Sequence, residues 1–413
     1  MELKLDTVVL RIKRPVKEAA GQPPSFPPAF PGAEMAAAVD DAGDVKLQVT
    51  SENMQLSPGE KGEVEAEDDV VGTVLSMPLS LIKPTNFDAQ PTDTGGDSWG
   101  IADIGADALD QNAGKGVTVA VLDTGIDIDH PAFDPIRAGI TFKDFTTAAK
   151  PNAYDDNGHG SHCAGTIFGQ DVTGRRIGIA RGVRNILIGK VLGQGGGRND
   201  QIFNAIVWAW NNKASVVSMS LGVDFTAFRE ELVTNFSVHP LVATSMALQG
   251  YRENLRLFDK ISGLFSTIRE LPAPLLIAAS GNESNRPQWT LPVAPPAEAA
   301  DILSVGAYDI SHQIAGFSNT NPDCCGPGVN ILSVAANTAQ GLRGLNGTSM
   351  ATPHVAGAAV LAAERLMKRD NITSDHDRTF TAHDLKNELM SRAQALPTIS
   401  RADGGVGQVQ AAP

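Results

Sequence analysis

Three short motifs of this 413-residue chain contain an aspartate, a histidine and a serine that could act together. They are Asp123-Thr124-Gly125, Gly158-His159-Gly160 and Gly347-Thr348-Ser349, in that order along the chain. In one known form of nucleophilic catalysis, a carboxylate orients an imidazole, and the imidazole takes the proton of an attacking hydroxyl. The residue types and their order therefore predict acyl transfer through a serine nucleophile.

Each of these residues has a setting that suits the predicted role. Asp123 follows the apolar run 117–122, at the carboxyl end of a predicted buried strand, where open α/β sheets build their sites. Glycines on both sides of His159 let the backbone come close to a neighbour. Ser349 opens a predicted helix, so its own N–H would point at a developing oxyanion, and Asn282 is the predicted side-chain donor to the same oxygen.

Taken singly, each motif has another interpretation. Asp123 could be a calcium ligand or a helix cap, and the triplet Asp-Thr-Gly also occurs in aspartic proteases. His159, His162 and Cys163 could be imagined as zinc ligands, but no further ligand pair has a recognisable spacing. His162 is more often a structural histidine, and an asparagine after a glycine, such as Asn282, is usually part of a turn. The combination of the motifs favours catalysis.

The chain from residue 99 onward alternates continuous apolar runs with helical patterns. Such β-branched runs are typical of strands buried on both faces of a parallel sheet, and they occur at 117–122, 186–192, 216–221, 275–279 and 302–305. A helical pattern at 202–209 follows Asn199-Asp200, predicted as its N-cap, and another helix is expected from Ser349 through Leu366. We predict an α/β fold with a doubly wound, mostly parallel sheet and helices on both faces.

The first 85 residues have a different pattern. Alternating runs at 45–49 and 71–82 predict antiparallel strands, and acidic, helix-capable stretches lie between them. Residues 23–31 are rich in proline and predict a loop. The predicted organisation is a small α+β module over 1–85, a linker over 86–98 and the main domain over 99–413.

Composition narrows the classes of partner. The net charge of −14 argues against nucleic acid and anionic membranes, both of which are polyanionic. The sequence has no run of about 18 apolar residues for a membrane span and no apolar core of a signal peptide near its start. We therefore expect a cytoplasmic protein, or one exported without a classical signal peptide. Three cysteines cannot form a disulfide scaffold.

With these observations in place, the chain resembles the subtilisin-like serine proteases, the subtilases, over residues 99–411. The phrases that carry the resemblance are 119–127, 157–166 and 346–357. Asp123, His159 and Ser349 match the catalytic triad of that family, and Asn282 matches its oxyanion residue. The resemblance implies a serine endopeptidase that acts on proteins or peptides and requires no cofactor for its chemistry.

The resemblance also implies a substrate groove and a regulator. Gly195-Gly196-Gly197 and Ser220-Leu221-Gly222 look like the two segments that pair with substrate backbone. Ala279-Ser280-Gly281 should line the primary side-chain pocket. The N-terminal module looks like a family propeptide, a folding chaperone and inhibitor whose tail, 73–82, leads into the cleft; an unrelated accessory domain is the alternative. A propeptide would be removed by self-cleavage within 82–98.

Three departures from the family pattern matter. The common calcium site uses an acidic residue after a His-Pro pair, but His130-Pro131 is followed by Ala132-Phe133, so we expect this site to be absent; calcium could still bind elsewhere. Cys163 matches a thiol that lies beneath the histidine in some members, which predicts sensitivity to mercurials, and its alternative role is a small buried apolar residue. A helical pattern at 248–268 exceeds what compact members carry, with the insertion placed near 223–246. It could pack on the sheet or form a partner surface.

Two other functions remain open from the sequence. A peptide ligase or macrocyclase would use the same acyl-enzyme and resolve it with an amine. A catalytically silent binding protein, held shut by the N-terminal module, is disfavoured by the complete set of Asp123, His159, Ser349 and Asn282.

Overall fold

The computed structural model describes residues 4–12, 37–39, 45–47, 49–86, 95–146, 154–265 and 271–411, with 37–39 and 45–47 as backbone. The predicted proline-rich loop 23–31 and most of the predicted linker 86–98 lie outside these residues. The end of the helical pattern, 266–268, also lies outside them.

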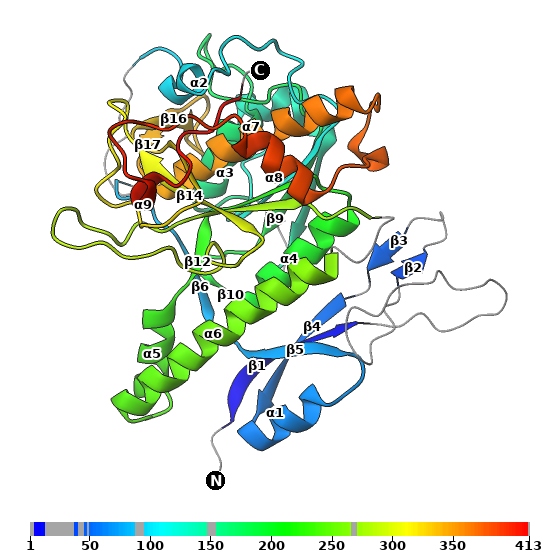
Figure 1. Cartoon of the computed structure of the whole chain (residues 1–413), viewed down its shortest axis with the longest axis vertical. Helices are drawn as coiled ribbons and strands as arrows, with labels where there is room; N and C mark the ends of the chain where they lie inside the picture. The colour runs from blue at the N-terminus through cyan, green and yellow to red at the C-terminus, as the bar shows by residue number, and fades with distance from the viewer. Residues whose placement is uncertain are drawn as a thin grey trace.

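A seven-stranded sheet forms the centre of the larger part of the chain (Figure 1). Its strand order is β15-β14-β13-β11-β7-β9-β8, and every neighbouring pair is parallel. The chain builds one side of β7 with β8 and β9 and the other side with β11, β13, β14 and β15, so the carboxyl end of β7 is a switch point where such sheets place ligands. The strands are β7 (Thr118–Asp123), β8 (Ile140–Asp144), β9 (Asn185–Lys190), β11 (Val216–Met219), β13 (Leu275–Ala279), β14 (Ile302–Tyr308) and β15 (Cys324–Pro327).

Helices cover both faces of this sheet. Along β7, Val119 and Val121 point into one apolar core, whereas Ala120 and Leu122 point into another. The first core is closed by α3 and α7 and the second by α4 and α6. Their bounds are α3 (His159–Phe168), α4 (Asn199–Asn211), α6 (Pro240–Phe265) and α7 (Thr348–Arg369). The predicted doubly wound α/β fold is confirmed.

The predicted N-cap of α4 is wrong. The helix begins at Asn199 and Arg198 holds the cap position, where its N–H donates to the Gln201 side chain at 3.0 Å. The Asn199 side chain is fully buried and donates through Nδ2 to the carbonyl oxygen of Leu75 at 3.0 Å. A contact distant in sequence therefore uses a residue whose local preference is to cap a helix.

The N-terminal residues form a separate antiparallel sheet with strand order β4-β1-β5. On one face Val9 packs with Val64 of α1, and on the other Val8 and Leu10 join the core that α4 and α6 close. Helix α1 begins in a capping box in which Ser57 and Glu60 bond reciprocally. The elements are β1 (Leu5–Ile12), β4 (Val49–Leu56), α1 (Pro58–Glu65), β5 (Val70–Leu75) and a hairpin of β2 (Ala37–Val39) and β3 (Val45–Leu47).

The alternating run 71–82 is divided between two sheets. Strand β5 ends at Leu75, and β6 (Pro78–Leu81) lies between β10 (Gly197–Arg198) and β12 (Leu221–Val223), antiparallel to both. The module that β5 completes is thereby joined through β6 to β10 and β12 (Figure 1). We call the space between β10 and β12, which β6 fills, the groove.

Between β12 and β13 the chain forms α5 (Phe225–Thr234) and α6. The N-terminal end of α6, next to α5, projects away from both sheets (Figure 1). The remaining elements are α2 (Trp99–Asp103), η1 (Pro131–Gly139), β16 (Ile331–Val334), β17 (Leu342–Leu345), η2 (Asp375–Asp377), α8 (Ala382–Met390) and α9 (Arg401–Gly404). Among the described helices, none has both the length and the apolar character that crossing a membrane demands.

Candidate active site

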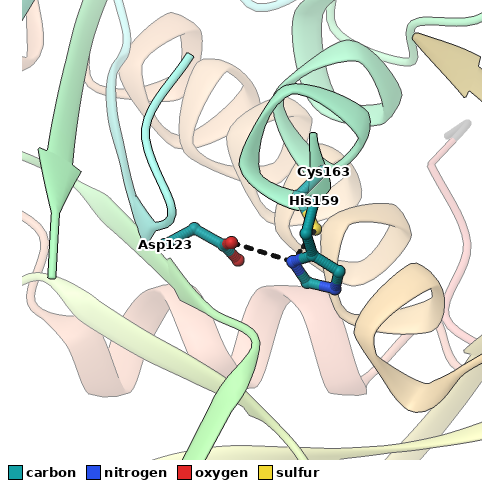
Figure 2. A group of neighbouring side chains, drawn as sticks. All are labelled: Asp123, His159 and Cys163. Atoms are coloured by element: carbon teal, nitrogen blue, oxygen red, sulfur yellow. Dashed lines mark hydrogen bonds and ion pairs between the residues drawn. The ribbon is translucent and has the colours of Figure 1, made fainter. Parts of the chain in front are cut away.

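The structure brings Asp123 and His159 into direct contact (Figure 2). Asp123 is the last residue of β7 and His159 is the first residue of α3. Asp123 Oδ1 lies 2.8 Å from His159 Nδ1, and both side chains are buried. A carboxylate can only accept a hydrogen bond, so the Nδ1 atom of His159 must carry the ring proton. The Nε2 atom is then the nitrogen that can take up a proton.

A second aspartate, Asp155, positions the histidine. Its Oδ1 accepts from the Thr124 hydroxyl (2.8 Å) and the Gly158 N–H (2.7 Å), and its Oδ2 accepts from the N–H and hydroxyl of Ser161 (2.8 and 2.7 Å). Asp155 is fully buried and so ties the end of β7 to the first turn of α3. The sequence analysis gave it no role, because the run Asp155-Asp156-Asn157 has the composition of an exposed turn.

A glycine allows the close approach of the two elements. A Cβ on Gly160 would lie 2.3 Å from the carbonyl oxygen of Gly125, which no side chain would tolerate. The Gly160 N–H also donates to the Thr124 hydroxyl at 2.9 Å. Gly160 is therefore explained by the close approach of α3 to the end of β7, and Gly158 by its left-handed φ of 95° at the N-cap of α3.

The electrostatics of the two histidines differ. Burial lowers the pKa of His159, but the charge and hydrogen bond of Asp123 and the contact with Cys163 together outweigh burial and raise that pKa well above its usual value. Burial lowers the pKa of His162 to about 3, and its Nε2 lies 3.0 Å from the carbonyl oxygen of Ile331. His162 is thus a neutral structural donor, whereas His159 has the basicity that a proton acceptor needs.

Cys163 lies beside His159, one turn further along α3 (Figure 2). Its Sγ is 3.8 Å from His159 Nδ1 and 3.4 Å from the carbonyl oxygen of Ser349. Asp123, His159 and Cys163 offer ligand atoms within 4.8 Å of one another. However, His159 Nδ1 already contacts Asp123, and burial raises the pKa of the Cys163 thiol, which opposes the thiolate that a metal requires. These residues fit a hydrogen-bonded group better than a metal centre, and sensitivity to mercurials stays a prediction.

Ser349 is the second residue of α7 and is fully buried beneath the segment that follows β6. Its Oγ donates to the carbonyl oxygen of Ile82 at 2.5 Å. The Ser349 carbonyl accepts from the hydroxyl of Ser220 at 3.2 Å, which ties α7 to the strand edge of the groove. Ser349, the predicted nucleophile, therefore lies at the groove, and its hydroxyl contacts the main-chain carbonyl of Ile82.

Asn282 follows β13 and lies at the same point of the groove. Its Nδ2 donates to the carbonyl oxygen of Lys83 at 3.0 Å. Its Oδ1 accepts from both the N–H and the hydroxyl of Thr348, each at 2.9 Å, so the amide has one orientation. Thr348 is a positioning residue that the sequence analysis missed, although its place beside Ser349 was a usable signal.

Ser349 and Asn282 contact carbonyl groups of two successive residues, Ile82 and Lys83. In an attack, the serine approaches the carbonyl carbon whose oxygen occupies the oxyanion donors, so both groups must meet the same residue. Beyond this point the Thr85 N–H donates to the carbonyl oxygen of Asn346 at 2.9 Å. With Ser349 as nucleophile and Asn282 as oxyanion donor, as predicted, the segment would leave the register that attack requires at Lys83.

The predicted backbone-binding segments flank β6. Leu221 and Gly222 pair with β6, and the Ser220 carbonyl accepts from the Ile82 N–H at 3.3 Å. Gly197 of β10 pairs with Leu79 of β6. A Cβ on Gly196 would lie 2.7 Å from the carbonyl oxygen of Leu79, and one on Gly195 would meet no atom within 4 Å in the described structure, so Gly195 is the outermost of these positions.

Ala279, Ser280 and Gly281 lie at the carboxyl end of β13, next to Asn282. A Cβ on Gly281 would lie 2.3 Å from Asn319 Nδ2 and 2.4 Å from Glu283 Oε2. Asn319 donates to Glu283 at 2.8 Å and to the Ser280 carbonyl at 3.2 Å. The assignment of these residues to the primary pocket stays a prediction.

The residues after His130-Pro131 are apolar and internal. Ala132 and Phe133 are fully buried in the core, and His130 Nε2 lies 3.0 Å from the carbonyl oxygen of Gly341. The absence of the common calcium site stays a prediction. The three cysteines are buried and free.

Comparison with known proteins agrees with the motifs. Residues 114–408 match the model of the subtilase family. The major intracellular serine protease of Bacillus subtilis (strain 168) is 34% identical over 253 residues, 60% of this chain and 68% of that protein. Subtilisin BL of Lederbergia lenta is 32% identical over 319 residues, 76% of this chain and 97% of that protein. The intracellular serine protease of Paenibacillus polymyxa is 32% identical over 310 residues, 74% and 82% of the two chains. The predicted resemblance is confirmed, and the chain belongs to the subtilase family of serine proteases.

Proposed function

We propose that the protein is a serine endopeptidase that is made as a self-processed zymogen. The observation that carries the proposal is the buried pair of Asp123 and His159 beside a groove that holds Ser349 and Asn282 against consecutive carbonyl groups of β-paired backbone. Backbone pairing on both sides of an extended segment is how peptides add to a sheet edge. The substrate is accordingly an extended stretch of protein or peptide.

The chemistry follows from the proton positions. Ser349 Oγ attacks the scissile carbonyl, its proton passes to Nε2 of His159, and Asp123 stabilises the imidazolium through Nδ1. The oxyanion receives hydrogen bonds from Nδ2 of Asn282 and the N–H of Ser349. The leaving amine takes the proton from His159, and water then hydrolyses the acyl-enzyme by the same steps in reverse order.

The N-terminal module acts as an intramolecular inhibitor in this proposal. Its tail occupies the groove through β6, and Ile82 and Lys83 cover Ser349 and Asn282 out of register. A peptide bond held in this way is cut slowly and excludes other substrates. Cleavage within 82–98 would separate the module from the enzyme.

The contact between the module and α6 has the polarity of a separable interface. Lys61 of α1 pairs with Glu253 of α6 at 2.7 Å, and Lys260 donates to the carbonyl oxygen of Val71 at 3.2 Å. A cavity of about 400 Å³ lies between these elements and is lined largely by charged and polar residues. These polar contacts border the apolar core that Val8 and Leu10 share with α4 and α6, so the interface has an apolar centre and a polar rim, as interfaces between separate proteins do.

A fluorophosphonate probe tests the proposal, because it reacts with an activated serine. We expect peptide mapping to find the adduct on Ser349, and Ser349→Ala to abolish it. Ser391→Ala, an exposed serine at the end of α8, is the matched control and should label as the unmodified chain does. Failure of Ser349 to label, even after removal of the module, would support the silent binding protein instead.

A ligase or macrocyclase would also label at Ser349. Mass spectrometry of products from a peptide with a free amino terminus separates the two: hydrolysis yields free acids, and ligation yields a joined or cyclic product. For location, we propose the cytoplasm, since the names of two relatives include the word intracellular. The acidic net charge supports a protein with neither nucleic acid nor membrane as partner.

A further inference from the structure

The groove follows the chain well beyond β6. The pairing of β6 with β12 continues to Ile82, whose N–H donates to the Ser220 carbonyl and whose own carbonyl meets Ser349, so Ile82 is taken as P1 and the offset arises only after it, at Lys83. The strand β6 then supplies P2 to P5. The preceding residues Met77, Ser76 and Leu75 are then P6, P7 and P8, and they are 0%, 1% and 8% exposed. Burial therefore extends as far as P8, although Pro78, Ser80 and Leu81 are only half-buried.

The larger domain binds the main chain of this extension at successive positions. Three carbonyl oxygens accept hydrogen bonds from the groove: Pro78 from the Asp224 N–H (2.9 Å), Met77 from the Asn199 N–H (3.3 Å) and Ser76 from the Arg198 guanidinium (2.5 Å). Main-chain contacts are available to any sequence. Asp224 lies at the start of α5, so the helical pair contributes directly to the groove.

Two asparagines converge on the carbonyl oxygen of Leu75. Nδ2 of Asn199 in α4 is 3.0 Å from it and Nδ2 of Asn254 in α6 is 3.3 Å from it. The two amides also bond to each other at 2.7 Å, and both side chains are fully buried. Buried amide groups are almost always hydrogen-bonded, so this pair favours a groove that contains a peptide as far as P8.

A glycine of α6 makes room for the P6 side chain. A Cβ on Gly250 would lie 3.0 Å from Sδ of Met77 and 3.4 Å from Cβ of Leu75. Met77 belongs to the same apolar core as Ala243 and Ala247 of α6. A glycine inside a long helix weakens the helix, and its presence here is explained by the space that Met77 occupies.

We propose that α4 and the α5–α6 pair form an extended substrate site that takes eight residues before the scissile bond, with a pocket at Gly250 for an unbranched apolar side chain at P6. This inference rests on the proposed endopeptidase function. When the module has left, the same donors bind an extended, unfolded polypeptide. The preferred substrates carry apolar residues at P4 and P6, as Leu79 and Met77 do here.

Two coumarin amides test the length of the site on the purified full chain, with active sites counted by the fluorophosphonate. The short substrate is acetyl-Leu-Ser-Leu-Ile and the long one is acetyl-Leu-Ser-Met-Pro-Leu-Ser-Leu-Ile, so P4 to P1 are identical. Burial of one methionine side chain predicts at least about a tenfold higher kcat/KM for the long substrate. Glycine in place of methionine at P6 should remove most of this gain.

A pair of glycine variants on α6 tests the pocket. Gly250→Leu fills the space of the P6 side chain, so kcat/KM for the long substrate should fall to within twofold of kcat/KM for the short one. Gly263→Leu, on the same helix and with no described atom within 4 Å of the added Cβ, should keep the ratio of the unmodified chain. Circular dichroism checks that both variants fold, and the substrate-length comparison stands without them.

The outcomes separate the two proposals. Equal kcat/KM for the long and short substrates, on protein that labels at Ser349, would show that the extension serves only the chain's own segment, and the inference would be wrong. Protein that neither labels nor hydrolyses either substrate, even after removal of the module, would overturn the inference together with the proposed function.

Discussion

The Oγ of Ser349 lies 2.5 Å from the carbonyl oxygen of Ile82, a residue 267 positions earlier in the chain. The proposed nucleophile is therefore covered by main chain from the N-terminal part. Because Asn282 bonds to the next carbonyl, that of Lys83, the contact blocks the site more than it presents a bond for cleavage. This relationship connects the catalytic and the regulatory parts of the account.

Weakening the segment should expose the nucleophile. Leu79 is 1% exposed in the centre of β6, so Leu79→Ala leaves a cavity that costs the groove-bound state about 2–5 kcal/mol. We expect the fluorophosphonate to label Ser349 of freshly purified full chain at least about tenfold faster in this variant. Ser80→Ala changes a half-buried neighbour of the same strand and should label at the original rate. Equal rates for Leu79→Ala and the unmodified chain would mean that the segment does not limit access.

The pH dependence should follow His159. Catalysis needs its neutral form, and Asp123 raises its pKa, so kcat/KM should fall as the pH drops through that raised pKa. Asp123→Asn removes the anion and should move the acidic limb of the profile to lower pH, with kcat reduced by about 10⁴-fold. Asp171→Asn, a carboxylate paired with Arg181, is the control and should leave the limb in place. A limb that stays fixed in Asp123→Asn would assign the titration to another group.

The oxyanion donor predicts a change in kcat. Asn282→Ala removes Nδ2, and loss of the corresponding donor in subtilisin lowers kcat by about 10²–10³-fold. We expect a similar loss here with little change in KM, because the hydrogen bond strengthens only in the transition state. Steady-state kinetics on the tetrapeptide substrate measures both constants. A rise in KM at constant kcat would make Asn282 a ground-state binding residue instead.

Stability should depend on His162 in acid. Burial lowers its pKa to about 3 from 6.5, so unfolding takes up a proton below pH 6.5 and stability declines as the pH falls toward 3. Between pH 7 and pH 5 this group alone accounts for a loss of about 2 kcal/mol. His162→Gln keeps a donor for the carbonyl oxygen of Ile331 but cannot titrate. Between pH 7 and pH 5 this variant should therefore lose about 2 kcal/mol less stability than the unmodified chain. Urea unfolding, with Ser349→Ala in both proteins to prevent self-digestion, measures the difference; equal losses would contradict the assignment.

Much of the catalytic framework was predictable from the sequence because its signals are local. The run 117–122 matches β7 to within one residue at each end, and Asp123 ends that strand. The glycine-flanked His159 and the helix at Ser349 could be recognised in the same way. These features depend on apolar continuity and backbone freedom, which a short stretch of sequence displays.

The contacts that were missed join residues far apart in the chain. Asp155 has no role in the sequence analysis, and only its buried contacts with Thr124 and Ser161 show that it positions α3. Asn199 was taken for a helix cap but binds the Leu75 carbonyl. The offset between Ile82 and Lys83 in the groove depends on pairing with strands more than 100 residues away, so no local pattern contains it.

The central claim, that Ser349 is the nucleophile and the chain's own segment lies in its groove, is tested most directly by self-processing. Unmodified full chain and Ser349→Ala are purified and incubated side by side, and the fragments are identified by N-terminal sequencing and intact mass. The account predicts a new N-terminus within residues 83–98 in the unmodified chain and an intact Ser349→Ala chain. The same fragments from both proteins, or no cleavage in either, would contradict it.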